Sequence, residues 1–171
     1  IADDHAVHDI GGIMGGIESG CCDTTTDVLI ECAYFDPASI ARTGQKLMLT
    51  SDARTRFERG VDPGFLDDGL AIATHLVRAL CGGTASEITR AGTPPVAAKT
   101  VAYRPARTLG LAGVEVDEAA QAAILTRLGF TVTTGDVWQI GVPSWRRDID
   151  GEADIVEEVV RIHGYAHVPS T

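Results

Sequence analysis

The sequence predicts an α+β fold, and three observations support that prediction. Apolar residues recur every three or four positions after residue 62 and again after residue 117, which is the spacing of one face of an α-helix. Apolar and polar residues alternate between residues 130 and 142, which is the pattern of a β-hairpin. A loop rich in Pro and Gly lies near residue 95, and we therefore predict two domains, residues 1–96 and 97–171.

The first domain opens with a glycine-rich segment, residues 11–20, followed by an apolar segment, residues 27–35, whose second part we expect to form a buried strand. Asp36-Pro37 then indicates the start of a helix, because Asp caps free N–H groups and Pro fits the first turn. We expect this helix to end near Gly44.

Asp62-Pro63 repeats the same start signal and precedes the clearest helix of the chain. Gly82-Gly83 marks its end. Five residues form its apolar face: Leu66, Leu70, Ala73, Val77 and Leu80.

The second domain contains a helix, a hairpin and a further helix. Asp117 caps the first helix and Gly129 closes it, while Gly164 stops the last helix, which starts near Glu152. The residues expected to face inward are Ala120, Ile124 and Leu128, then Phe130, Val132, Trp138, Ile140 and Val142 of the hairpin, and finally Ile155, Val159 and Ile162. This order suggests a small winged helix-turn-helix-like domain.

The composition is that of a folded protein, with 44% apolar and 22% charged residues. The formal net charge of -10 argues against a protein whose whole surface coats nucleic acid, since phosphates repel an acidic surface. A local basic patch is compatible with that charge. The basic stretch Arg42, Lys46, Arg54, Arg56 and Arg59 could meet the phosphates of a nucleic acid, or could pair internally with Asp52, Glu58 and Asp62.

No apolar run reaches the roughly 18 residues of a membrane span, and the first residues lack the features of a signal peptide. A chain that starts at Ile1 instead of Met is expected to be a piece of a longer protein. Cys21, Cys22, Cys32 and Cys81 have no zinc-ligand spacing. We expect them to behave as small buried apolar residues in a reducing compartment, the cytoplasm.

Glu31 lies within the most apolar segment, between Ile30 and Cys32, where an ionised side chain is costly to bury without a partner. One of the arginines could supply that partner, and so could a hydroxyl group of a ligand. The glycines before it are not a phosphate loop, because Ile17 stands where such a loop needs Lys.

Acidic residues cluster on the last predicted helix. Asp154, Glu157 and Glu158 share one face, and Asp148 lies a short loop earlier. They could form a solvated face that Arg146, Arg147 and Arg161 partly neutralise. They could also bind Mg²⁺, which prefers oxygen ligands.

Several long motifs, in this order and spacing, resemble the beta subunits of bacterial phenylalanyl-tRNA synthetases, in their editing domain and the domain after it. The resemblance covers nearly the whole chain. The motifs lie at residues 11–20, 29–37, 51–53, 56–63, 81–83 and 143–148, with Glu157-Glu158 and Gly164-Tyr165 closing the second domain.

The resemblance implies hydrolysis of tyrosine wrongly attached to the phenylalanine tRNA. By position, Glu31 matches the carboxylate that accepts the tyrosine hydroxyl, and Gly15, Ser51 and Ala53 match other pocket positions. The family commonly has Thr where Ser51 stands. The resemblance implies no certain catalytic side chain, and it places part of the site before Ile1, so that these residues alone are expected to be inactive.

The resemblance also implies partners and cofactors. An alpha subunit completes an alpha2 beta2 heterotetramer, in which Mg²⁺ is shared with Asp148, Asp154, Glu157 and Glu158 of this chain. ATP serves the complex but is not expected to bind here, and tRNA(Phe) is the nucleic-acid partner, with Arg42, Lys46 and Arg54 as its expected contacts. Two further hypotheses are a nucleic-acid-binding winged-helix module at residues 100–165 and a scaffold that docks the alpha subunit.

Overall fold

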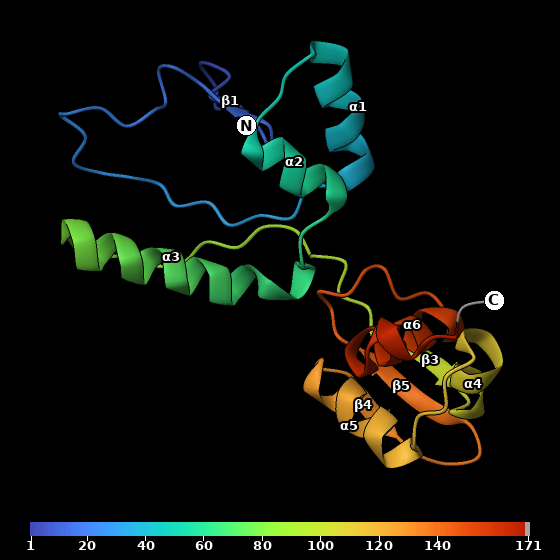
Figure 1. Ribbon diagram of the computed structural model, residues 1–171. Coiled ribbons are helices and arrows are strands. Elements are labelled where there is room, and N and C mark those ends of the chain that lie inside the picture. Colours follow the sequence, from blue (N-terminus) through green and yellow to red (C-terminus); the bar gives the residue numbers. More distant parts are fainter. Residues whose placement is uncertain (170–171) are drawn as a thin grey trace. The chain divides into compact units, whose positions relative to one another are not determined.

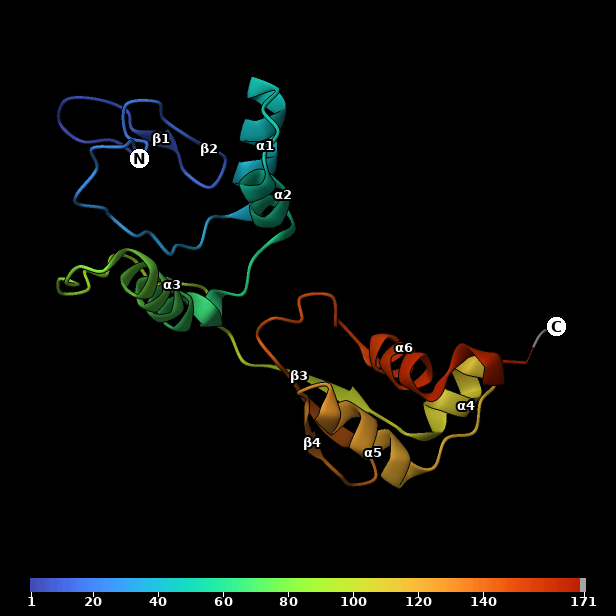
Figure 2. The same ribbon diagram turned by 60° about the vertical axis from the view of Figure 1, so that its left-hand side comes forward.

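The computed structural model describes residues 1–169, and the chain divides into two compact units, Ile1–Pro95 and Val96–Thr171. Helices and small antiparallel sheets occur in both units (Figures 1 and 2), which confirms the α+β prediction. Among residues 1–169, no helix has the length and apolar character needed to cross a membrane.

The first unit has a short two-stranded sheet followed by three α-helices. The strands are antiparallel, with Asp9 opposite Gly15. The elements are β1 (Asp9–Ile10), β2 (Met14–Gly15), α1 (Pro37–Leu47), α2 (Asp52–Arg59), a 3-10 turn η1 (Pro63–Phe65) and α3 (Leu66–Cys81). Of its large apolar side chains in the described part, only Ile13 and Ile40 are buried.

The prediction of a buried strand in the second part of residues 27–35 is wrong. This segment has no regular secondary structure, and Leu29 is 95% exposed. An apolar run forms a strand only where a second strand supplies its hydrogen bonds, and a run of this kind does not itself specify that partner.

Helix α1 begins where the sequence predicts, with the Asp36 side chain accepting from the Ser39 N–H (2.8 Å). It continues past Gly44, however, and ends at Leu47, before Met48 at φ 53°. Gly44 is buried because the Arg54 side chain of α2 occupies the space where a Cβ would lie. The glycine therefore permits close packing of α1 and α2 and does not end the helix.

Helix α3 confirms the predicted helix and its end before Gly82, which has φ 79°. Asp62 accepts from the Gly64 N–H (2.8 Å) and starts the 3-10 turn that leads into it. No residue of α3 is buried, and Leu80 is 83% exposed. The apolar periodicity therefore predicted the helix correctly, but the apolar residues are not buried.

The second unit is built on a three-stranded antiparallel sheet of order β3-β5-β4. The predicted hairpin is confirmed, with Val132 opposite Ile140. Neither β3 nor α4 was foreseen. The elements are β3 (Lys99–Tyr103), α4 (Ala106–Ala112), α5 (Glu118–Arg127), β4 (Thr131–Thr133), β5 (Trp138–Val142), α6 (Glu152–His163) and a 3-10 turn η2 (Tyr165–His167).

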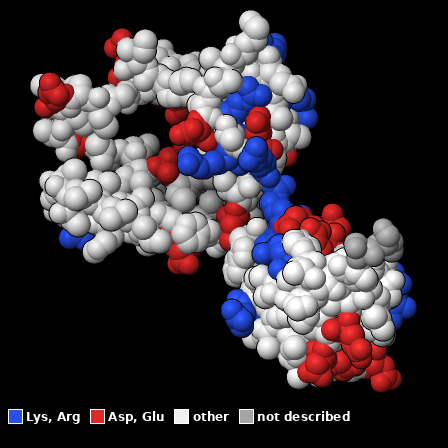
Figure 3. All heavy atoms as spheres, in the orientation of Figure 1, with Lys and Arg blue, Asp and Glu red and all other residues white. Residues whose placement is uncertain are grey.

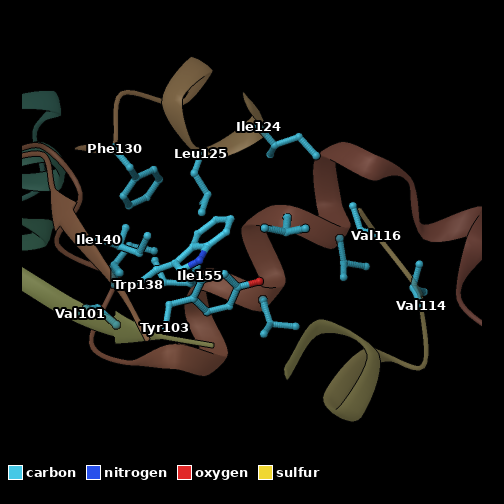
Figure 4. Packing of buried hydrophobic residues seen from close by; sticks show 14 residues of the cluster. Val101, Tyr103, Val114, Val116, Ile124, Leu125, Phe130, Trp138, Ile140 and Ile155 are labelled. Carbon is cyan, nitrogen blue, oxygen red and sulfur yellow. The ribbon is translucent and has the colours of Figure 1, made fainter. Parts of the chain in front are cut away.

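The core of this unit lies between the sheet and the helices (Figure 4). The Tyr103 and Trp138 rings meet edge to face, with centroids 5.9 Å apart. The Tyr103 hydroxyl hydrogen-bonds Thr108 (2.7 Å) and Gln121. Because all of these polar groups have partners, burying them carries no large penalty.

Two inward faces differ from the prediction. On α5, Gln121, Ile124 and Leu125 are buried and Ala120 is exposed. Gln121 can be buried in place of Ala120 because its side-chain amide donates to the carbonyl of Val116. On α6, Ile155 and Val159 are buried as predicted, together with Val156 and Val160. Ile162 is 39% exposed.

The cysteines are free thiols, as expected for a chain without a disulfide framework. The prediction that the cysteines are buried is wrong, because Cys21, Cys22 and Cys81 are exposed and Cys32 is half-buried.

Candidate functional site

A hollow of about 260 Å³ opens in the first unit between the β1–β2 turn, residues 31–35 and α2. Three of the four pocket residues proposed from the sequence line it: Gly15, Glu31 and Ala53. The other lining residues are Asp9, Ile10, Gly12, Ile13, Met14, Ala33, Phe35 and Phe57.

Two aromatic rings and the glycine turn shape this hollow. Phe35 and Phe57 meet edge to face, with centroids 5.0 Å apart. A Cβ on Gly12, which has φ 69°, would lie 2.7 Å from the Phe35 ring, so the turn needs glycine there for both space and conformation. A Cβ on Gly15 would meet no atom within 4 Å, because this residue faces the open space of the hollow.

Ser51 does not line the hollow, unlike the other three proposed residues. Its hydroxyl accepts from the Arg54 N–H (3.0 Å) and so caps α2. The same hydroxyl donates to the carbonyl of Ile13 (2.5 Å). Ser51 therefore connects α2, which carries Ala53, to the turn between β1 and β2, next to the strand that carries Gly15.

Glu31 is exposed on one side and lines the hollow on the other. Partial burial raises the pKa of Glu31, and the Asp9 carboxylate raises it further, while the Ile1 ammonium lowers it. Arg54 does not serve as its partner, because its guanidinium pairs with Glu58 (2.9 Å). Of the arginines and the ligand hydroxyl considered as partners of Glu31, this arrangement therefore excludes Arg54.

The histidines near the start of the chain do not line the hollow. His8 Nε2 lies 2.9 Å from Asp3 Oδ2, and the Asp3 carboxyl has its pKa lowered to about 2, chiefly by that hydrogen bond. The chemistry of the hollow in residues 1–169 is therefore that of two carboxylates, backbone groups and aromatic rings.

Asp9 is the lining residue that the sequence reasoning missed. Its Oδ1 atom is buried and has no hydrogen-bond partner within residues 1–169. The only available signal was a carboxylate placed directly before Ile10 and the glycine-rich turn.

The three basic residues proposed as tRNA contacts lie on α1 and α2, where Lys and Arg side chains gather in Figure 3. Arg42 and Lys46 are exposed, and Arg42 donates to the Ser39 hydroxyl (3.0 Å). The side chain of Arg54 is only 15% exposed and is held by Glu58, so it does not present a free charge.

Two of the four carboxylates proposed to bind Mg²⁺, Glu158 and Asp148, are neutralised by arginines and share Arg146. Glu158 is nearly buried and binds Arg146 (2.7 Å) and Arg161 (2.6 Å). Burial raises the pKa of Glu158, but the hydrogen bonds from both arginines outweigh burial and leave the pKa lowered. Arg146 also binds Asp148 (2.6 Å) and lowers the pKa of that carboxyl.

The two remaining proposed metal ligands are Asp154 and Glu157. Asp154 accepts from the backbone N–H groups of Asp150 (2.7 Å) and Gly151 (2.8 Å) at the start of α6. Glu157 is exposed. No group of three or more His, Cys, Asp or Glu side chains in residues 1–169 is arranged to hold a metal ion. The four carboxylates therefore do not fit Mg²⁺ as they are arranged here.

Two family models match the chain. A B3/4 domain matches residues 1–82, and a tRNA synthetase B5 domain matches residues 101–165. The B3/4 match therefore contains the hollow, and the B5 match contains β4, β5, α6 and most of β3.

Curated relatives match over the full length of the chain. A phenylalanine–tRNA ligase beta subunit of Novosphingobium aromaticivorans is 61% identical over 171 residues, which are 100% of this chain and 21% of the relative. The proteins of the same name from Zymomonas mobilis and Paramagnetospirillum magneticum are 50% and 48% identical, again over 100% of this chain and over 21% and 22% of their own lengths. The chain thus spans about a fifth of the length of these relatives.

Proposed function

Since the chain belongs to the family of phenylalanine–tRNA ligase beta subunits, of which it carries a B3/4 and a B5 domain, we propose that its first unit forms one wall of a hydrolytic editing pocket. The substrate would be tyrosine wrongly esterified to the phenylalanine tRNA. Such a complex would act in the cytoplasm, with amino-acid activation by ATP on another subunit.

The convergence of Gly15, Glu31 and Ala53 on one hollow carries this proposal. Its volume, about 260 Å³, lies just below the roughly 300–1,000 Å³ of typical small-molecule pockets, and so suits one amino-acid side chain. Phe35 and Phe57 provide aromatic surface for a ring.

The position of Glu31 explains how tyrosine would be selected. A synthetic site that accepts phenylalanine discriminates poorly against the same ring with one added hydroxyl, so a second site must recognise that hydroxyl. Glu31 can accept a hydrogen bond from the hydroxyl, and phenylalanine would leave the carboxylate without this partner. Phenylalanyl-tRNA, the correct product, would therefore bind in the hollow more weakly than tyrosyl-tRNA.

The proposal is tested with the full-length beta subunit assembled with its partner. We expect Glu31→Ala to leave phenylalanine charging intact and to lower the hydrolysis of tyrosyl-tRNA(Phe). Glu18→Ala, which changes an exposed carboxylate of the same unit, serves as the matched control. Hydrolysis of tyrosyl-tRNA by Glu31→Ala at the parent rate would contradict the role of Glu31.

For the tRNA itself, we propose that Arg42 and Lys46 approach its phosphates. Their exposure on α1 supports this role, whereas the internal pairing of Arg54 argues against including that residue. Replacing both exposed residues by Gln should weaken tRNA(Phe) binding and reduce its dependence on salt concentration.

For the second unit, we propose docking against the alpha subunit of an alpha2 beta2 complex. The exposed apolar side chains of Leu109, Trp145 and Tyr165 support an interaction surface more than a phosphate-binding one, as does the acidic helix α6. Loss of co-purification with the alpha subunit after Trp145→Ser would support this role, and retention of full affinity would oppose it.

A magnesium ion shared between the subunits is a separate proposal. Arg146 and Arg161 would first have to leave Asp148 and Glu158, because they neutralise those carboxylates here. Glu157 is exposed and needs no such exchange. Titration of Mg²⁺ into the assembled complex and into its Asp148→Asn/Asp154→Asn variant tests this proposal, and equal affinities would exclude these ligands.

A further inference from the structure

Asp9 and Glu31 place two carboxylates in one small hollow. Asp9 lies on β1 directly opposite Gly15, and its side chain is 28% exposed. Its Oδ1 atom is nevertheless out of contact with solvent and accepts no hydrogen bond. The Ile1 ammonium forms an ion pair with that atom at 3.7 Å, which is longer than a hydrogen bond, and it donates to the Asp9 carbonyl (2.9 Å).

A carboxylate oxygen that is shielded from water and has no donor is costly, and most such groups in folded proteins have a partner. The neighbouring carboxylate makes the arrangement less favourable still, because the charge of Asp9 acts on Glu31 across the hollow. The Asp9 side chain is 28% exposed and lines the hollow, so a ligand that brings a positively charged donor to its exposed part would offset the repulsion between the two carboxylates. The hollow therefore favours a ligand that combines a cation with an aromatic body.

An aminoacyl ester of tRNA has this combination of groups. The ring of a tyrosyl ester can pack against the surface formed by Phe35 and Phe57, and its α-ammonium group is a charged donor close to the ester bond. Charge-assisted hydrogen bonds are the stronger kind, and they gain strength where water is excluded.

We propose that Asp9 accepts a hydrogen bond from the α-ammonium group of the aminoacyl ester, while Glu31 receives the ring hydroxyl. This inference rests on the proposed editing function and adds a second recognition element to it. Asp9 selects for an α-amino acid whatever its side chain, whereas Glu31 selects tyrosine over phenylalanine. The two carboxylates therefore have separable effects on hydrolysis.

The test compares two esters of tRNA(Phe) with the full-length beta subunit assembled with its partner. One ester carries tyrosine, and the other carries the α-hydroxy acid of the same shape, 3-(4-hydroxyphenyl)lactate. For the parent, kcat/KM should be about tenfold to a hundredfold higher for the ammonium ester after correction for spontaneous hydrolysis, since a hydrogen bond to a charged group has that effect. Asp9→Asn, which keeps the side-chain shape, should remove most of this preference by slowing tyrosyl hydrolysis alone.

Asp4→Asn is the control, because it neutralises an exposed carboxylate on the same segment and should leave both rates at their parent values. Equal losses on both esters in Asp9→Asn would overturn the inference and point to an effect through Glu31 or through folding. Unchanged rates would overturn it as well. The parent comparison needs no variant, so equal parent rates on the two esters would refute the inference even if Asp9→Asn failed to fold.

The proposed function fails separately from this inference. A parent complex that hydrolyses no tyrosyl-tRNA overturns both proposals. A parent that hydrolyses it, and loses this activity in Glu31→Ala but not in Asp9→Asn, keeps the editing function and removes only the role of Asp9.

Discussion

Glu158→Gln is expected to destabilise the second unit strongly. The Glu158 side chain is 7% exposed and holds Arg146 and Arg161, and Arg146 itself is only 18% exposed. The substitution removes the negative charge but keeps the side-chain shape. It leaves Arg146 partly buried with Asp148 as its remaining ion-pair partner among residues 1–169.

The size of the effect follows from these contacts. Removing one partner of a buried ion pair costs about 3–5 kcal/mol, and we take about 2–3 kcal/mol because Arg161 is exposed and Arg146 keeps Asp148. A unit of about 75 residues has a total stability of roughly 4–11 kcal/mol. For a unit of this size, such a loss should lower Tm by about 10–20 °C.

Tryptophan fluorescence measures this unit selectively, because both tryptophans of the chain, Trp138 and Trp145, lie in it. Trp138 is 3% exposed, so unfolding should shift its emission to longer wavelength. Glu157→Gln, at an exposed neighbouring position on α6, is the matched control and should change Tm by no more than about 2 °C. A decrease below about 4 °C for Glu158→Gln would refute the reasoning that the ion pairs stabilise the fold.

Two further predictions concern pH and the shape of the hollow. Hydrogen bonding from Arg104 lowers the pKa of Glu152 from 4.5 to about 2, so this group stabilises the folded state above about pH 4.5 and loses that contribution as the pH falls toward 2. The Tm of the tryptophan signal should therefore fall less steeply between pH 5 and 2.5 in Glu152→Gln, and parallel curves for variant and parent would contradict this. Gly15→Val should fold, since a Cβ there meets no atom within 4 Å, but its side chain would narrow the hollow and lower the tyrosyl-tRNA hydrolysis that we propose for the assembled complex. Ala123→Val on the exposed face of α5 is its control, and equal hydrolysis by Gly15→Val and parent would indicate that the hollow is not the substrate site.

Much of the local structure could be predicted from the sequence. Asp36-Pro37 and Asp62-Pro63 marked helix starts correctly, and the alternation from Phe130 to Val142 located the hairpin. These signals act between residues close in the chain, through caps, fixed φ angles and side-chain alternation. Gly15, Glu31 and Ala53 were selected by resemblance, and the structure brings them to one hollow.

Pairing between distant residues was decided only by the tertiary structure. In the tertiary structure, residues 27–35 have no partner strand and Arg54 forms an ion pair with Glu58. The Ser51 hydroxyl donates to the carbonyl of Ile13, and Ser51 does not line the hollow. The acidic residues that share one face of α6 also have different interaction partners in the tertiary structure. Arg146, which precedes the helix, binds Glu158, whereas Asp154 caps the start of its own helix. Sequence periodicity specifies which residues share a face, whereas the partner of a charge or of a strand depends on which segments the fold brings within a few ångströms of it.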